Sequence, residues 1–172
     1  MDRINWTDWF MIQALWISQR SPDKSTQHGC VIVDKNNHML SYGYNGYPVN
    51  VDDSKMPQTR PEKYPPILHS EENAIYNCNQ SMEGATVYIT GPPCIHCLAA
   101  MIQKRVSKIV YGHVKSANSK SPYLKDGPEN DVAKLLLENQ DIKMVLWEPD
   151  NAILIDRGFM YIQTQFNTAL LS

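Results

Sequence analysis

Apolar side chains dominate residues 6–18, directly after an asparagine that can cap a helix. Asp8 stands three positions after Asn5, as in a variant of the capping box. This arrangement predicts a first helix over residues 6–18, and its large apolar residues predict that the helix is largely buried. Pro22 and the small polar residues around it end the helix. Residues 30–46 then predict a strand, a Lys-Asn-Asn turn and a second strand, which together form a β-hairpin.

Further along the chain, helical and strand patterns alternate. In the stretch 94–104, apolar residues recur with the i, i+3, i+4, i+7 spacing of a helix that packs on a core. The alternation predicts parallel strands joined by crossover helices, with the hairpin as an antiparallel edge and helices on both faces of the sheet. The fold class is therefore mixed α/β. The expected elements after the hairpin are a helix at 70–79, a strand at 85–90, a helix at 94–104, a strand at 108–112, a helix around Val132, Leu135 and Leu136, and a strand at 142–147.

Between the hairpin and the helix at 70–79 lies a long segment, residues 47–67, without a clear helical or strand pattern. It holds five of the eleven prolines of the chain. Loops of this length are uncommon in compact domains unless they have a function. We therefore expect a functional loop or lid. Residues 157–172 give no clear prediction.

Length and composition are those of a soluble globular protein, and we expect one domain over residues 1–172. No run of eighteen apolar residues is present, so no membrane association is expected. The N-terminus lacks a secretory pattern and two of the four cysteines form a Cys-x-x-Cys pair, which predicts a cytoplasmic protein. Sixteen basic and eighteen acidic residues give a net charge of -2, which disfavours polymeric nucleic acid as a partner but leaves small anions possible.

Three residues have the chemistry of zinc ligands. Cys94 and Cys97 open a predicted helix, and His69 precedes the helix before it. Helix N-termini favour thiolates, and zinc prefers thiolate and imidazole ligands. A Cys-x-x-Cys pair alone also fits a redox pair or half of a structural zinc site. A closed structural site needs a fourth ligand, however, and Cys30 and Cys78 lie where free cysteines are more often small core residues.

Glu71 favours a catalytic site with one position left for water. A carboxylate two residues after a zinc-bound histidine can accept the proton of a metal-bound water without ligating the metal. The spacing His-x-Glu followed by Pro-Cys-x-x-Cys is the signature of zinc nucleobase deaminases. His69, Glu71, Pro93, Cys94 and Cys97 match it without exception.

Three blocks resemble the deoxycytidylate deaminases: "GYNG" at 43–46, "KYPPILHSEENAI" at 63–75 and "VYITGPPCIHC" at 87–97. The resemblance extends from about Trp6 to Trp147. It implies the cytidine-deaminase fold, a three-layer α/β/α arrangement with a five-stranded mixed sheet. It also implies one catalytic Zn2+ per subunit and hydrolysis of dCMP to dUMP and ammonia, which supplies dUMP for thymidylate synthesis. A homohexamer activated by dCTP and inhibited by dTTP is implied too, with Mg2+ accompanying a triphosphate effector.

The same resemblance implies roles for residues outside the zinc signature. Asn45 matches the family asparagine that contacts the sugar, although Asn-Gly is also a common hairpin turn. The remaining residues matched to the substrate are Arg20, Ser21, Ser70 and Tyr123, and those matched to the effector pocket are Gly43, Tyr44 and Gly46.

One departure from the family lies in the proline-rich segment, which has no cysteine between residues 47 and 68, so a second zinc site is not expected. Deaminases of tRNA adenosine, of free nucleosides, of guanine and of the riboflavin pathway share the zinc signature. The "GYNG" block, the proline-rich insertion and the weakly acidic charge favour a mononucleotide substrate. A zinc-stabilised binding module without turnover is the alternative from a different class, and it predicts no ammonia release.

Overall fold

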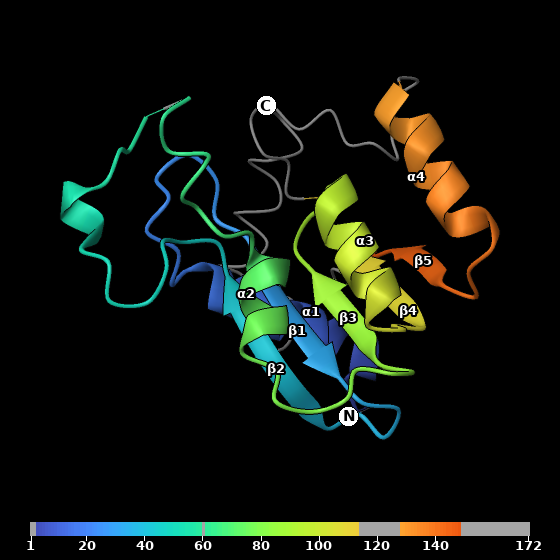
Figure 1. The fold of residues 1–172 in the computed structure, drawn as a ribbon. Coiled ribbons are helices and arrows are strands. Elements are labelled where there is room, and N and C mark those ends of the chain that lie inside the picture. Colours follow the sequence, from blue (N-terminus) through green and yellow to red (C-terminus); the bar gives the residue numbers. More distant parts are fainter. Residues whose placement is uncertain (1–2, 60, 114–127, 149–172) are drawn as a thin grey trace.

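The structure is a computed structural model that describes residues 3–59, 61–113 and 128–148. This part of the chain forms a five-stranded sheet with helices packed on it (Figure 1). Along the chain the elements are α1 (Trp6–Ser18), β1 (Gly29–Val33), β2 (Met39–Tyr44), the 3-10 helix η1 (Asp53–Lys55), α2 (Ser70–Tyr76), β3 (Thr86–Ile89), α3 (Ile95–Gln103), β4 (Lys108–Tyr111), α4 (Pro128–Glu138) and β5 (Lys143–Leu146).

The sheet is mixed, as predicted. Its strands lie in the order β2-β1-β3-β4-β5. Strand β1 pairs antiparallel with both β2 and β3, whereas β3, β4 and β5 are parallel to one another. Helices α3 and α4 make the two crossovers between the parallel strands. The hairpin therefore supplies the antiparallel edge.

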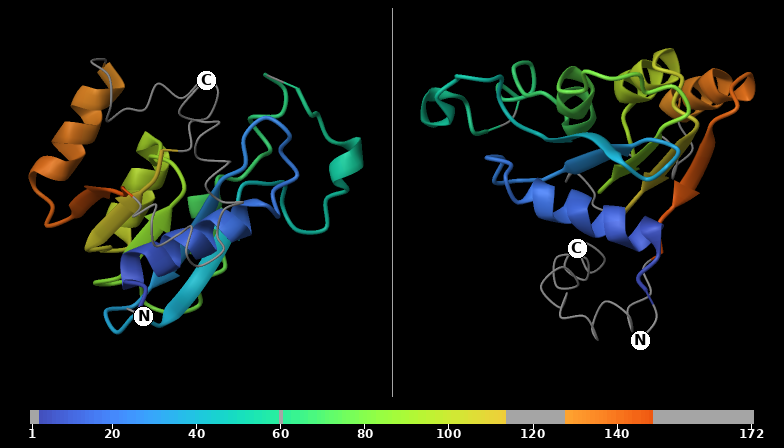
Figure 2. Two further views of the ribbon diagram at one scale, coloured as in Figure 1. Left: turned by 180° about the vertical axis from the view of Figure 1, so that it is seen from behind. Right: turned by 90° about the horizontal axis from the view of Figure 1, so that it is seen from below.

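Helices cover both faces of the sheet, which confirms the three-layer α/β/α architecture. Helix α1 lies on one face, and α2, α3 and α4 lie on the other (Figure 2). Because side chains alternate between the faces of a strand, the buried strand β1 contributes to two cores. Val31 and Val33 pack with α1, whereas Cys30 and Ile32 pack with residues of α2 and α3.

Helix α1 begins as predicted but is less buried than predicted. The Asn5 side chain accepts a hydrogen bond from the Asp8 backbone at 2.9 Å, which caps the first turn. Trp6, Trp9 and Trp16 are 52%, 42% and 53% exposed. A helix that packs on one sheet face buries a single stripe, so large apolar residues elsewhere on its surface stay accessible.

Helix α2 is shorter than predicted, because it ends at Tyr76 and not at Asn79. The Asn77 side chain donates to the Asn73 side chain, and the Cys78 backbone turns back to the Ile75 carbonyl. Asparagine and other small polar residues favour such terminal turns over further helix. The seven-residue helix still places its first turn at the site described below.

The proline-rich segment is irregular apart from η1, as expected. Gly46 and Leu68 exchange two backbone hydrogen bonds, which bring the ends of the segment together. The predictions for Tyr123 and for residues 157–172 fall outside the described residues. Within the described ranges, no helix is long and apolar enough to cross a membrane.

Candidate metal centre and catalytic cavity

The three predicted zinc ligands meet at the N-termini of two neighbouring helices. His69 is the N-cap residue of α2, and its backbone amide donates to the Glu72 carboxylate at 2.8 Å. Cys94 is the N-cap residue of α3, and its sulfur accepts from the backbone amide of Cys97 at 3.5 Å. The candidate ligands therefore lie at two helix starts, as the sequence predicts, and the capping hydrogen bonds help to orient them.

The distances within this group fit one tetrahedral ion. The Nδ1 atom of His69 lies 3.4 Å from the Cys94 sulfur and 3.5 Å from the Cys97 sulfur. Ligands at ordinary zinc distances and tetrahedral angles would place nitrogen and sulfur about 3.6 Å apart. In the described part of the chain, these three residues are the one group of His, Cys, Asp or Glu side chains with metal-binding geometry. All four cysteines are free thiols.

Protonation of this group is coupled. In the absence of a bound metal, hydrogen bonding with Cys97, and then with His69, lowers the pKa of the Cys94 thiol to about 4. The hydrogen bond with Cys94 raises the pKa of His69 to about 9. The pKa of Cys97 is raised, first by its hydrogen bond to the Cys94 sulfur and then by burial. One thiolate is thus already present, and two protons remain for a metal ion to displace.

Glu71 lies beside the ligands as a buried carboxyl group. Its Oε2 accepts a hydrogen bond from the Ser70 hydroxyl at 2.7 Å. Burial raises its pKa, against the opposing effects of His69 and Ser70. A carboxyl group with a raised pKa next to a metal site is suited to take up and return a proton. Ser70, predicted as a substrate residue, therefore orients Glu71 in this structure.

His69, Cys94 and Glu71 open onto a cavity of about 150 Å³. It is walled by the loop after α1, the Asn45 turn, the end of the proline-rich segment and the loop before α3. The residues that line it are Asp23, Thr26, His28, Asn45, Lys63, Tyr64, Ile67, His69, Ser70, Glu71, Gly91, Pro92 and Cys94. Segments far apart in the sequence thus converge on the candidate metal centre.

Asn45 lies in this cavity wall, and its side-chain amide forms hydrogen bonds within the protein. Its Oδ1 accepts from the His28 backbone at 2.7 Å, and its Nδ2 donates to the Thr26 carbonyl at 3.0 Å. One N–H and one lone pair remain for another partner. The predicted contact with a sugar is compatible with this position and stays a prediction.

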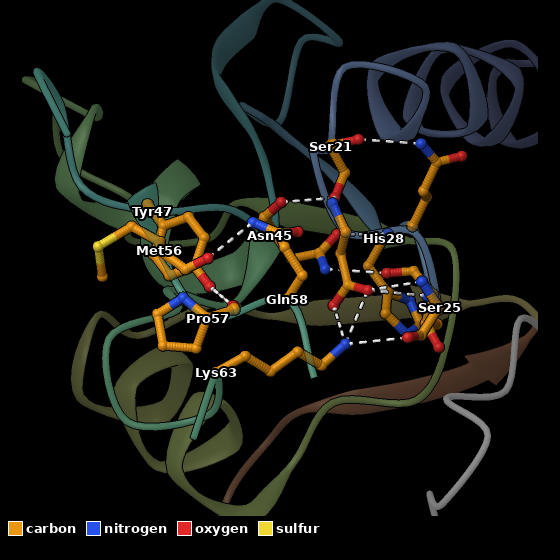
Figure 3. A network of polar contacts seen from close by, with 12 residues as sticks. Ser21, Ser25, His28, Asn45, Tyr47, Met56, Pro57, Gln58 and Lys63 are labelled. Atoms are coloured by element: carbon orange, nitrogen blue, oxygen red, sulfur yellow. Dashed lines mark hydrogen bonds and ion pairs between the residues drawn. The ribbon is translucent and has the colours of Figure 1, made fainter. Parts of the chain in front are cut away.

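A buried ion pair forms another part of the wall. The Lys63 ammonium group contacts both carboxylate oxygens of Asp23 at 2.8 Å and the Ser25 hydroxyl at 3.2 Å (Figure 3). Burial raises the pKa of Asp23, but the hydrogen bonds from Lys63 and from the Ser25 and Thr26 amides outweigh it and hold the pKa below its usual value. The pair fastens the proline-rich segment to the loop after α1.

The predicted phosphate residues take different positions. Arg20 is exposed and is not among the residues that line the cavity. Ser21 is buried, and its hydroxyl donates to the Asn45 carbonyl at 2.6 Å, so it supports the cavity wall from behind. Tyr123 lies outside the described residues. Phosphate binding by these three residues stays a prediction.

The residues assigned to an effector pocket hold the site together in this structure. A Cβ atom on Gly43 would lie 2.4 Å from backbone atoms of Ser70 and Ala74, so this glycine allows β2 to approach α2. Gly46 pairs with Leu68, the neighbour of His69. Tyr44 accepts a hydrogen bond from Asn73 at 2.9 Å and lines a separate groove of about 560 Å³.

Several residues of the cavity were not predicted from the sequence. Lys63 stands inside a block that resembles the family, and that block is a signal that could have pointed to it. Asp23, Thr26 and His28 belong to no recognisable motif, so the sequence does not indicate that they line the cavity. Their assembly depends on the packing of the loop after α1 against the Asn45 turn.

Comparisons with known proteins show the family of this chain. Residues 4–113 match the family described as "Cytidine and deoxycytidylate deaminase zinc-binding region". A "Probable deoxycytidylate deaminase" of Caenorhabditis elegans is 45% identical over 108 residues, which are 59% of this chain and 54% of the relative. The chain thus spans about half the length of the worm protein. The "Deoxycytidylate deaminase" of Mus musculus is 31% identical over 163 residues, 90% of this chain and 87% of the mouse protein.

A solved structure shares the fold. The dCMP deaminase from the cyanophage S-TIM5, in complex with dCMP and dUMP, superposes with a TM-score of 0.67. The two proteins are 23% identical, and the superposition covers 86% of this chain and 100% of the phage protein. This likeness bears out the expected architecture of a five-stranded mixed sheet with helices on both faces.

Proposed function

The chain belongs to the cytidine and deoxycytidylate deaminase family, and we propose that it catalyses the zinc-dependent hydrolytic deamination of dCMP to dUMP and ammonia. The observation that carries this proposal is the position of Glu71, a buried carboxyl group that opens onto the same cavity as His69 and Cys94. A purely structural zinc site needs only its four ligands and does not require a buried carboxyl group beside them.

In this mechanism His69, Cys94 and Cys97 would hold the ion, which when bound lowers the pKa of a water molecule. Glu71 takes a proton from the attacking water as its oxygen adds to C4 of the pyrimidine. Glu71 then delivers that proton to N3, takes a second proton from the hydroxyl group now on C4 and passes it to the 4-amino group. The C4–N bond breaks, ammonia leaves, and C4 becomes the carbonyl carbon of the uracil. Ser70 donates to Oε2 of Glu71 and holds the carboxyl group in place throughout.

The choice of dCMP among deaminase substrates is supported by the relatives. Both the worm and the mouse proteins carry the name deoxycytidylate deaminase. The net charge of -2 suits a small nucleotide better than a nucleic acid polymer. Asn45 on the cavity wall is available to a sugar hydroxyl through its free N–H and lone pair.

The resemblance also supports finer proposals. The chain forms one domain, assembles as a homohexamer, acts in the cytoplasm and supplies dUMP for thymidylate synthesis. Its activity is raised by dCTP and lowered by dTTP, with Mg2+ accompanying the triphosphate. Gly43, Tyr44 and Gly46 are the residues proposed near the effector, and the groove beside Tyr44 is a place where such a nucleotide could be sought.

One assay tests the proposed substrate and the proposed effectors. The zinc-loaded protein is incubated with dCMP, dCTP, deoxycytidine or adenosine, and ammonia release is measured with and without dCTP and dTTP as effectors. Fastest release from dCMP supports the proposed substrate. Preference for another compound in the set contradicts dCMP as the substrate. No release from any of them refutes dCMP deamination and leaves the binding module and the deaminases of guanine, tRNA adenosine and the riboflavin pathway as the alternatives.

A further inference from the structure

His28 is held in the cavity wall by its backbone. Its amide donates to Oδ1 of Asn45 at 2.7 Å, and its carbonyl accepts from the Asn45 backbone amide at 3.2 Å. These contacts belong to the polar network around Asn45 (Figure 3). The backbone of His28 is therefore fixed at the cavity wall. Its ring does not belong to the group of candidate zinc ligands.

The ring is oriented by Thr90, which directly follows β3. Nδ1 of His28 lies 3.1 Å from the Thr90 hydroxyl, and that hydroxyl also accepts from the Gly29 backbone amide at 3.1 Å. Thr90 is completely buried, and His28 is the one acceptor that the described residues offer to its O–H. A buried hydroxyl donates where an acceptor exists, so Thr90 donates to Nδ1 and the ring carries its proton on Nε2.

Nε2 has no hydrogen-bond partner within the described part of the protein. Burial, followed by the nearby charge of His69, lowers the pKa of His28 to about 4, so the ring is neutral at pH 7. The adjacent wall residue Thr26 has a buried hydroxyl that likewise lacks a partner among the described residues. Unpaired polar groups in the wall of one cavity indicate that a polar ligand completes their hydrogen bonding.

We propose that His28 is a substrate-orienting residue whose Nε2–H donates a hydrogen bond to an oxygen of the nucleoside part of the bound nucleotide. This inference rests on the proposed function. The reacting ring must reach Glu71 and the metal ligands, and the cavity that they share with His28 has a volume of only about 150 Å³. A donor on its wall is therefore within reach of the pyrimidine O2 or the sugar next to it.

Two substitutions test the role by kinetics. His28→Val removes the donor, and we expect kcat/KM for dCMP to fall about tenfold, the value of one hydrogen bond to a bound ligand. His28→Gln keeps an N–H donor on a side chain of similar reach, and we expect a smaller loss. Zinc content of both variants should match the wild type. The unfolding midpoint of His28→Val should fall, because the buried Thr90 hydroxyl loses its acceptor, whereas the amide oxygen of His28→Gln can still accept from Thr90. Unchanged kcat/KM in His28→Val would overturn the inference.

A spectroscopic measurement tests the ring itself without turnover. In the zinc-loaded wild type at pH 7, 15N chemical shifts should show Nε2 of His28 protonated and Nδ1 unprotonated, and addition of dUMP should move the Nε2 resonance. A proton on Nδ1, or no response to bound dUMP, contradicts the inference. Failure of the wild type to release ammonia from dCMP would instead refute the proposed function, so the two failures are distinguishable.

Discussion

The Nζ atom of Lys63 lies 2.8 Å from both carboxylate oxygens of Asp23, and both side chains are buried, at 3% and 7% exposure. Removing one partner of a buried pair leaves the other charge uncompensated. We expect Lys63→Met to lower the free energy of unfolding by about 3–5 kcal/mol, measured by urea denaturation. Lys55→Met is the matched control, because Lys55 and Asp52 form an exposed pair, and its midpoint should stay near that of the wild type. Equal effects of the two substitutions would contradict the stabilising role of the buried pair.

Glu71→Gln tests the proposed proton transfer. Glutamine has nearly the same shape but cannot take up a proton from water, so kcat for dCMP should fall by about 10² to 10⁴-fold. Zinc content and the circular dichroism spectrum should not change. Glu83→Gln, an exposed position paired with Arg105, serves as the control and should retain wild-type turnover. A Glu71→Gln protein with near-wild-type kcat would exclude the assigned role.

Cys97→Ser tests the metal centre. We expect the wild type to contain one zinc ion per chain and the variant to lose most of it, because a serine hydroxyl is a poor zinc ligand. Elemental analysis after dialysis against a weak chelator measures this directly. Cys78→Ser is the control, since Cys78 lies outside the ligand group. Full zinc retention in Cys97→Ser would show that the ion is held elsewhere.

Zinc uptake should depend on pH. Without metal, His69 has a pKa of about 9 and the pKa of Cys97 is raised, so both carry protons at pH 7. Binding should therefore release about two protons, and affinity should fall as pH decreases because protons compete with the ion. Calorimetry in buffers of different ionisation enthalpy gives the proton count. An affinity independent of pH between 6 and 8 would contradict this account.

Gly43→Ala tests the close contact between β2 and α2. The added Cβ would lie 2.4 Å from the Ser70 carbonyl oxygen. We expect α2 to shift, with a loss of about 1–3 kcal/mol in unfolding free energy and reduced kcat, because Glu71 lies on this helix. Gly46→Ala is the milder comparison, since its nearest neighbours are side-chain atoms at 3.3 Å. If Gly46→Ala proves the more damaging change, the contact does not set the position of α2.

Local patterns were sufficient to predict much of this protein. The order of helices and strands follows from apolar periodicity, and the mixed sheet follows from that order. His69, Glu71, Cys94 and Cys97 were predicted because their positions depend on short spacings and on helix N-termini. Such features are local, so a single sequence carries them. Two details were predicted wrongly: helix α1 is less buried than predicted, with three exposed tryptophans, and α2 ends earlier than predicted. The burial of a helix depends on the elements that pack on it, and its end depends on the terminal turn.

The sequence by itself determined the elements and the fold class, because these depend on patterns of residues close together in the chain. It also predicted the candidate zinc ligands, because each lies in a short motif at a helix N-terminus. Only the tertiary structure decided which other side chains share the cavity. Lys63 meets Asp23 across 40 positions, and His28 meets Thr90 across 62. Contacts over such separations are set by how the loops pack around the sheet, and the spacing of residues along the chain does not encode that packing.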